Sequence, residues 1–461
     1  MKKIVVIPLG RIEDYLDSKY TYEYLENYFN PNGCFDEVYC LSNSGVTMKV
    51  GKVQYINAHP DKFNEIISEI HPDIVRAYAG CEPCDWAVAN RVKGIPIVVS
   101  VHDPNTDLMH QSLKYADYII CMSQVVKEAV IKHVIDVDKR KIYVMPNRVD
   151  TNIFYKRDDK ESFKDLNRVY GDGIHILHVG RKVMQKNLET LIQALQYLPV
   201  EYKAVFIGHG EVAPYKKLAH ACQVEERCFF VDSVNREKLP IYYSWCDCMC
   251  TPSRYEGFGI VFIEAAACEC SIVTSNIPPM NEYLTDKKDC ILVDEYESPE
   301  ILAKAIAYAC GKDEKIYKMK RNAREVGLKF DKKFVDRQEI ELYNIFIKNG
   351  SDDTHFDKLE KEREKLKLPV VAFGAGKMGK RLLDYLGNKN IMFFVDNDRN
   401  KIGQQIGGVE IISYADFKKI KDKYIVVVTP ENRKEIVQKL MFDGIEYMED
   451  AWYRLLLEQV K

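Results

Sequence analysis

The chain of 461 residues lacks any long apolar run. No segment approaches the roughly 20 apolar residues that a membrane-spanning helix needs. The start, Met1–Pro8, has the charge and hydrophobicity of a signal peptide, but the polar residues 11–14 end it early, so we expect a first β-strand there. We therefore expect a cytoplasmic protein, and we leave open its peripheral association with the inner face of the membrane.

The chain also lacks an excess of charge of either sign. Its 66 basic and 69 acidic residues leave a formal net charge of −3. A near balance of this kind offers no general attraction for the phosphates of nucleic acids. We therefore expect no nucleic-acid partner.

Cysteine is present, with 14 residues, but without the spacing of a structural zinc site. Cys81 and Cys84 form a Cys-x-x-Cys pair, and no second pair lies nearby at the right spacing. Cys246, Cys248 and Cys250 alternate, which on a strand would place all three on one face. We expect reduced, buried thiols that pack as small apolar side chains, and no metal.

The most informative segment is Thr251–Glu264, which reads TPSRYEGFGIVFIE. Glu256 falls in a loop and Glu264 about one and a half turns into the following helix, so both carboxylates can face one cleft. Between them, the Gly-x-Gly turn at 257–259 exposes backbone N–H groups at a helix N-terminus, where anions and sugar hydroxyls bind. A strand–turn–helix unit with one capping and one solvated acid is the structural alternative.

A second loop carries positive charge near the start of a helix. A buried strand expected at 174–179 is followed by Gly180, Arg181 and Lys186, and then by apolar residues at helical spacing. Two cations beside a helix N-terminus make a diphosphate site, whereas two solvated loop cations are the structural alternative. The next strand ends at Gly208, in a tight turn where a ligand could approach the backbone.

Taken in this order, the motifs resemble the retaining GT-B glycosyltransferases of the family-4 type. The resemblance covers roughly residues 1–345 and includes His102–Asp103, Ser123 and Pro146–Asp150. It implies an α/β fold with two Rossmann-like domains, each a doubly wound parallel sheet, that face a cleft.

The resemblance also implies a role for each candidate residue. Arg181 and Lys186 are expected to bind the donor diphosphate, and Glu264 to bind the ribose. Glu256 and the amides of Gly257, Phe258 and Gly259 are expected to bind the donor sugar. Gly180 and Gly208 lie in the adjoining loops of the same site. His102 would lie close to the transferred sugar. We take His102, Arg181, Lys186 and Glu256 as the catalytic set.

The sequence departs from the family in two places. The link between the domains usually reads Asn-Gly-Val-Asp, and Arg148 stands here in place of the glycine. If that position needs a positive φ, Arg148 is strained. The first loop, Pro8–Arg11, lacks the Gly-Gly pair of many members. Both departures bear on acceptor contacts more than on donor binding.

Alternating strands and helices predict parallel sheets with helices on both faces. In the first domain we expect strands near 3–8, 36–41, 73–78, 95–101, 118–122 and 141–145. The expected divisions are a first domain at 1–150, a donor-binding domain at 151–330, a helix at 331–350 that returns to the first domain, a charged linker at 351–368 that can be helical, and a third domain at 369–461. The expected anchors of the returning helix are Phe334, Ile340, Tyr343 and Ile347.

The third domain, residues 369–461, has a dinucleotide-binding pattern. Gly374, Gly376 and Gly379 follow a strand and open a helix, and Asp396 ends the next strand. The unit resembles the small Rossmann-like domains of sugar acyltransferases, which implies a site for a nucleotide, a nucleotide-sugar or NAD(P), or a scaffold for oligomerisation. A glycine turn that only packs helix on strand is the alternative. We interpret the Asp-x-Asp at Asp396 as a ribose contact or a turn rather than as a magnesium site.

The sequence therefore predicts a retaining, metal-independent glycosyltransferase. It would move a sugar from a UDP- or GDP-sugar to a glycan or lipid-linked acceptor, in surface polysaccharide synthesis. An NAD(P)-dependent sugar oxidoreductase centred on 374–396 and a non-catalytic nucleotide-sugar binder are the alternatives. The donor base, the sugar, the acceptor and the oligomeric state are not specified.

Overall fold

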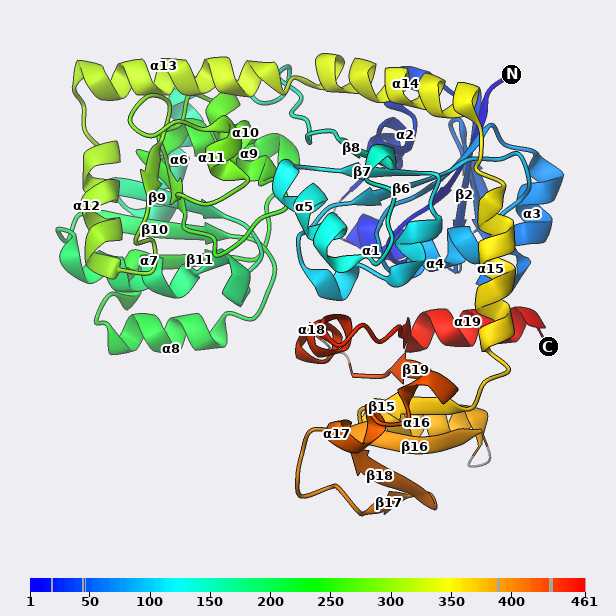
Figure 1. Cartoon of the computed structure of the whole chain (residues 1–461). Coiled ribbons are helices and arrows are strands. Elements are labelled where there is room, and N and C mark those ends of the chain that lie inside the picture. The colour runs from blue at the N-terminus through cyan, green and yellow to red at the C-terminus, as the bar shows by residue number, and fades with distance from the viewer. Residues whose placement is uncertain (18–19, 44, 46, 388–389, 431–433, 461) are drawn as a thin grey trace. The chain divides into compact units, whose positions relative to one another are not determined.

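The computed structural model describes residues 1–17, 20–43, 45, 47–387, 390–430 and 434–460 as three sheets with helices packed against them (Figure 1). The chain divides into two compact units. The first contains residues 1–121, 126–143 and 340–461, and the second contains residues 122–125 and 144–339. The predicted α/β class, with a third small sheet, is confirmed. Among the described helices, none is long and apolar enough to cross a bilayer.

The first sheet has eight strands in the order β3-β4-β2-β1-β5-β6-β7-β8. The six expected strands are present, and the hairpin of β3 and β4 was missed because its short first strand is largely exposed. The strands are β1 (Lys3–Ile7), β2 (Glu37–Ser42), β3 (Met48–Val50), β4 (Val53–Asn57), β5 (Ile74–Ala77), β6 (Ile97–Val101), β7 (Tyr118–Cys121) and β8 (Ile142–Val144). The helices are α1 (Ile12–Asp17), α2 (Tyr22–Phe29), α3 (Phe63–Ile70), α4 (Glu82–Ala89) and α5 (Gln124–His133).

The second sheet has six parallel strands in the order β11-β10-β9-β12-β13-β14. The strands are β9 (Ile174–Val179), β10 (Tyr202–Ile207), β11 (Cys228–Val231), β12 (Cys248–Thr251), β13 (Ile272–Ser275) and β14 (Ile291–Val293). The helices are α6 (Lys160–Tyr170), α7 (Leu188–Ala194), α8 (Ala213–Ala221), α9 (Leu239–Trp245), α10 (Ile260–Ala267), α11 (Met280–Tyr283), α12 (Pro299–Ala309) and α13 (Glu314–Lys329). Apolar side chains of β9, β10, α7 and α12 form one core of this unit.

Most of the 14 cysteines are buried, and among the described residues none forms a disulfide. Cys246 lies at the end of α9, outside strand β12, so the prediction that it shares a strand face with Cys248 and Cys250 was wrong. It packs instead against Cys270, with 3.4 Å between the two sulfur atoms. The expectation of buried thiols that fill the core holds for Cys246, Cys248 and Cys250.

The expected amphipathic helix after residue 331 is α14 (Lys332–Asn349). Tyr343 is a buried anchor as predicted, and it accepts a hydrogen bond from Arg76 of β5. Phe334 was a wrong choice, since it is 45% exposed, while Val335 and Phe346 are buried. In the first half of the helix, the buried side chains include two acids, Asp336 and Glu339, whereas Phe334 faces solvent.

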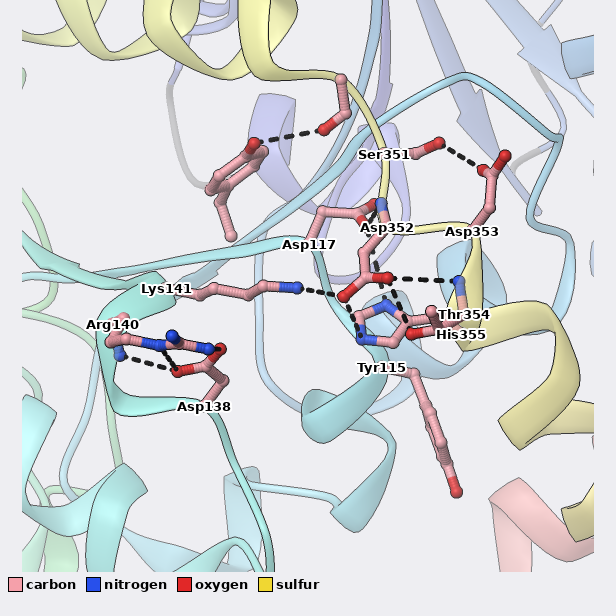
Figure 2. Close-up of polar contacts among 12 residues, drawn as sticks. Tyr115, Asp117, Asp138, Arg140, Lys141, Ser351, Asp352, Asp353, Thr354 and His355 are labelled. Carbon is pink, nitrogen blue, oxygen red and sulfur yellow. Dashed lines mark hydrogen bonds and ion pairs between the residues drawn. The ribbon is translucent and has the colours of Figure 1, made fainter.

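The charged segment after α14 forms a packed helix, α15 (Thr354–Lys365). His355 at its start is buried beside Asp117, with 3.5 Å between Nδ1 and Oδ1, and Asp352 pairs with Lys141 at 2.6 Å (Figure 2). Asp117 also forms a buried ion pair with Arg91 at 2.9 Å. These contacts fix α15 to the first sheet, so the charges of this segment are not merely solvated.

The third sheet has the order β17-β18-β16-β15-β19-β20, with β17 antiparallel to β18. The strands are β15 (Val370–Phe373), β16 (Ile391–Asp396), β17 (Gln405–Ile406), β18 (Val409–Ser413), β19 (Ile425–Val428) and β20 (Met448–Glu449). The helices are α16 (Lys377–Leu386), α17 (Tyr414–Phe417), α18 (Lys434–Phe442) and α19 (Asp450–Val460). The helix expected from Asn432 onward is α18, and Asn432 itself lies outside the described residues.

Each sheet reverses its winding direction at one point. The chain leaves β1, β9 and β15 toward one edge of the sheet, and it later returns to the opposite side of the same strand as β5, β12 and β19. In open α/β sheets, ligands bind outside the carboxyl ends of the strands at such a switch point. The fold therefore offers three places where a ligand could bind.

Candidate functional site

The switch point of the second sheet brings together the two loops that the sequence singled out. Gly180 follows β9 and the segment 252–259 follows β12, so both loops lie at the same sheet edge. The loops are tied to each other, since the Arg254 N–H donates to the Gln185 carbonyl at 2.8 Å and the Gln185 amide donates to the Tyr255 carbonyl at 3.0 Å.

Lys186 and Glu256 meet in this site as an ion pair. Their Nζ and Oε1 atoms are 2.5 Å apart, and both side chains are largely buried. The Ser253 hydroxyl donates to the same Glu256 oxygen at 2.7 Å. The structure thus confines one cation and one carboxylate at the edge of the sheet, where low exposure to water strengthens their interactions with a ligand.

Arg181 is exposed. Its guanidinium approaches only the Gln185 side-chain oxygen, at 3.5 Å, and no acid lies within ion-pair distance among the described residues. The neighbouring Lys182, which the sequence reading passed over, is buried and donates to the carbonyls of Gly208 and Val231. Burial lowers the Lys182 pKa. Lys182 therefore joins three loops, and Arg181 is left available.

The glycine after β10 is required by backbone packing. A Cβ on Gly208 would lie 2.0 Å from the Gly180 carbonyl oxygen, and the Gly208 φ of 145° is one that side chains rarely adopt. The space beside Gly208 is thus filled by protein backbone. The absence of a side chain at Gly208 serves the contact between the two loops.

The turn before α10 leaves backbone donors available. Gly259 has a φ of 82°, and a Cβ there would meet the Phe262 ring at 2.5 Å. Phe258 is buried against Tyr283, whose hydroxyl donates to the Phe258 carbonyl at 2.8 Å, and the Gly257 carbonyl accepts from Ser123 at 2.6 Å. Among the hydrogen bonds of the described residues, none uses the N–H of residues 257–259.

Glu264 lies on α10 and has protein partners of its own. Its Oε1 accepts from Arg236 at 2.8 Å, and its Oε2 accepts from the Tyr243 hydroxyl at 3.4 Å. Burial raises the Glu264 pKa, and Arg236 opposes that rise. The sequence reading missed Arg236. Its position could have indicated a role in the site, because Arg236 follows a strand by a few residues, as Arg181 does.

His102 lies in the first unit, at the end of β6. With Asp103 it lines a hollow of about 180 Å³ whose other walls come largely from the loops after β1 and β5 and from helices α1 and α2. Its ring centroid is 6.5 Å from that of Tyr78. His102 therefore sits at the switch point of the first sheet.

The glycine loop of the third sheet borders a further hollow, of about 320 Å³, that Thr429 and Pro430 also line. A Cβ on Gly379 would lie 2.1 Å from the Gly374 carbonyl oxygen, whereas Gly376 faces open space. Asp396 accepts from the Ala375 N–H at 3.0 Å and from Lys401 at 3.1 Å. Gly374 and Gly379 thus close the turn, and only Gly376 leaves room for a ligand.

No group of three or more His, Cys, Asp or Glu side chains in the described part of the chain is arranged to hold a metal ion. The Asp-x-Asp at Asp396 forms a turn, in which Asp396 Oδ1 accepts from the Asp398 N–H at 2.9 Å. Cys81 and Cys84 are buried and free.

Two families of known proteins match most of the first two sheets. Residues 39–153 match the family described as Glycosyltransferase Family 4, and residues 159–326 match the family described as Glycosyl transferases group 1. The chain belongs to the GT-B glycosyltransferases of the family-4 type. Residues 366–449 of this glycosyltransferase match a third family, described as C2185-like, N-terminal.

Similar proteins agree with this assignment. An uncharacterised glycosyltransferase of Methanocaldococcus jannaschii is 27% identical over 60% of this chain and 76% of its own length. The D-inositol 3-phosphate glycosyltransferase of Xylanimonas cellulosilytica is 31% identical, and the match spans 35% of this chain and 41% of that protein. The Anabaena protein HepE, solved in complex with UDP, shares the fold with a TM-score of 0.62 and 17% identity, over 75% of this chain and all of HepE.

Proposed function

We propose that this glycosyltransferase binds a nucleotide-sugar donor at the switch point of its second sheet and transfers the sugar with retention of configuration and without a metal ion. The observation that carries the proposal is the arrangement at this edge: a buried Lys186–Glu256 pair, an unpaired Arg181 and three consecutive N–H groups without protein acceptors. A nucleotide-sugar carries a diphosphate and a polyhydroxylated sugar ring. Cations and backbone amides bind the diphosphate, and carboxylates accept hydrogen bonds from the sugar hydroxyls.

The buried ion pair can provide two separate contacts to the donor, one to its phosphate and one to its sugar. A phosphate oxygen can take the Lys186 ammonium from Glu256, and the released carboxylate can then accept hydrogen bonds from sugar hydroxyls. Because the two groups are joined before the donor arrives, each is already held in the place where it is needed. Arg181 would contribute the second cation from the exposed side of the same loop.

The chemistry requires charge stabilisation on the leaving group. As the glycosidic bond breaks, negative charge grows on the diphosphate, and Lys186, Arg181 and the amides of 257–259 would stabilise it. These groups supply the positive charge that a metal supplies in other transferases. In this arrangement Glu264 stays paired with Arg236 and the released Glu256 carboxylate is occupied by sugar hydroxyls, so we propose no glycosyl-enzyme. The acceptor itself attacks, on the face that the leaving group vacates, which retains the configuration.

The names of relatives support the choice of donor and acceptor classes. HepE was solved with UDP, and another relative is named an O-antigen chain mannosyltransferase of Salmonella typhimurium, 27% identical over 39% of this chain and 48% of its own length. We therefore propose a UDP- or GDP-sugar donor and a glycan or lipid-linked acceptor in surface polysaccharide synthesis, at the inner face of the membrane. For the third domain we propose nucleotide binding at Gly376, with NAD(P) as the alternative ligand.

Turnover tests the proposal. Incubation of the full chain with a panel of UDP-, GDP- and ADP-sugars, with release of the nucleoside diphosphate as the readout, is expected to give activity with one donor class in the presence of a chelator. Arg181→Ala and Lys186→Ala are expected to lower kcat by about 100- to 1,000-fold each. Lys217→Ala, an exposed cation on α8 of the same unit, serves as the control. Full activity in both variants, or activity that disappears with chelator, would refute the proposal.

A further inference from the structure

The hollow at the switch point of the first sheet has an unusual lining. Its walls include the side chains of Tyr15, Tyr28 and Tyr78, and its polar ends are His102 and Asp103. No lysine or arginine is among its described lining residues. A pocket with this lining offers aromatic surface and neutral hydroxyls, but no cation for a phosphate group.

The aromatic rings continue from the hollow along helix α2. Four rings follow one another with centroid distances of 5.0 Å from Tyr78 to Tyr28, 6.2 Å from Tyr28 to Tyr24, and 4.7 Å from Tyr24 to Tyr20. We name Tyr20, Tyr24, Tyr28 and Tyr78 the tyrosine row. Three of its members are four residues apart, which places them on one face of the helix and its N-terminal extension.

The tyrosine row runs from the surface to the candidate catalytic histidine. Tyr20 is 38% exposed, whereas Tyr78 is buried and its ring lies 6.5 Å from that of His102. The guanidinium of Arg76 lies over the Tyr78 ring at 5.0 Å, and Arg76 is itself held by Ser100. The inner end of the row is therefore buried against Arg76, and its outer end meets solvent.

We propose that the tyrosine row is an acceptor track for an oligosaccharide, whose terminal sugar enters the hollow at His102 while the preceding sugars lie along Tyr28, Tyr24 and Tyr20. This inference rests on the proposed glycosyltransferase function and specifies its acceptor. Sugar rings present C–H groups on their faces and hydroxyls at their edges, and tyrosine offers a flat apolar face with a polar tip to match both.

The size and charge of the site favour a saccharide chain over a lipid phosphate. The hollow of about 180 Å³ is smaller than the roughly 300–1,000 Å³ of a drug-sized site, so it suits a single ring. A lipid diphosphate would need cations at the hollow, and none lines it. The Tyr15 hydroxyl donates to the Leu9 carbonyl at 2.8 Å, whereas burial raises the pKa of Tyr28 and keeps its hydroxyl protonated and able to donate.

The test compares ligand length in variants of the full chain. Linear gluco-, manno- and galacto-oligosaccharides, from monosaccharide to pentasaccharide, are titrated by calorimetry. We expect the affinity of at least one series to rise with length. Tyr24→Leu and Tyr20→Leu are each expected to weaken the pentasaccharide about three- to tenfold and to leave the monosaccharide unchanged.

Tyr22→Leu is the matched control, because Tyr22 lies on the same helix but packs on Tyr55, outside the row. Its affinities should equal those of the wild type. The proposal is overturned if no series binds, if affinity is independent of length, or if the row variants bind pentasaccharide as the wild type does. UDP-glucose and GDP-mannose are titrated in parallel, so that donor binding without saccharide binding rejects the acceptor track alone, and saccharide binding without donor binding rejects the proposed function.

Discussion

The replacement of the family's glycine by Arg148 leads to a specific stability prediction. Arg148 is not among the residues with positive φ, so the strain considered from sequence is absent. Its guanidinium instead pairs with Asp336 and Glu339 of α14, whose side chains are 0% and 1% exposed. The link between the domains is thus held by one cation that neutralises two buried acids.

The magnitude follows from the burial of the acids. The second carboxylate oxygen of Asp336 has no hydrogen-bond partner among the described residues, so removal of Arg148 leaves this acid without its cation. Breaking a buried pair by removing one partner costs about 3–5 kcal/mol. Because Arg148 is 20% exposed, water can partly replace it, and we expect Arg148→Ala to cost about 3 kcal/mol. For a unit of this size that lowers Tm by roughly 6–12 °C.

The pH dependence distinguishes this mechanism from a general loss of packing. Burial raises the Asp336 pKa, and Arg148 opposes the rise. In Arg148→Ala this opposition is removed, so the Asp336 pKa should be higher than in the wild type. A raised carboxyl pKa means that the folded state binds the proton more tightly, and stability then falls as pH rises through the window above about pH 4. The loss of unfolding free energy in Arg148→Ala should therefore be largest near neutral pH, and it should shrink as pH is lowered toward 4.

Unfolding of the second unit can be followed through Trp245, in a background in which Trp86 and Trp452 are replaced by phenylalanine. Arg168→Ala, which removes an exposed ion pair with Asp165 in the same unit, is the control and should leave the transition unchanged. A deficit below about 1 kcal/mol for Arg148→Ala, or one that does not change with pH, would refute the reasoning.

Three further predictions follow from the described contacts. Burial alone would raise the Asp117 pKa, but the bond from His355 and the charge of Arg91 lower it, so Asp117 contributes stability above about pH 4 that is lost as pH falls; urea titrations should show this acid loss in the wild type and not in Asp117→Asn, which is itself less stable at pH 7. Gly208→Ala should destabilise the second unit by several kcal/mol by calorimetry, because its Cβ would overlap the Gly180 carbonyl, and a wild-type Tm would contradict this packing. Gly376→Asp should abolish binding of nucleotides to the third domain in thermal-shift assays of the full chain, and unchanged shifts would locate that ligand elsewhere.

The parts of the site that lie within one strand–loop–helix segment were predictable from the sequence. The strand at 174–179, the cations that follow it and the acid at Glu256 were found because hydrophobic periodicity marks where a buried strand ends. Topology then brings the two loops to the same edge, which is why Lys186 and Glu256, 70 residues apart, could be expected to meet.

The contacts that could not be predicted depend on long-range packing of charged groups. Nothing in the local pattern indicates that Arg236 pairs with Glu264 or that Arg148 pairs with Asp336. The helix α15 reads as a charged linker because its neutralising partners lie in another part of the chain, as Asp117 does for His355. Each residue of a buried ion pair is charged, and a charged residue considered alone is expected to be solvent-exposed. The partner that permits its burial lies far away in the sequence.

The central claim is that the switch point of the second sheet binds the diphosphate of a sugar nucleotide. Calorimetric titration of the full chain with UDP-glucose and GDP-mannose measures this directly, in the wild type, Arg181→Ala, Lys186→Ala and the Lys217→Ala control. We expect one donor to bind the wild type and the control equally, and the two site variants to bind it at least about tenfold more weakly, since a hydrogen bond to a charged group contributes about 1.5–3 kcal/mol. Equal affinity in all four proteins would contradict the account.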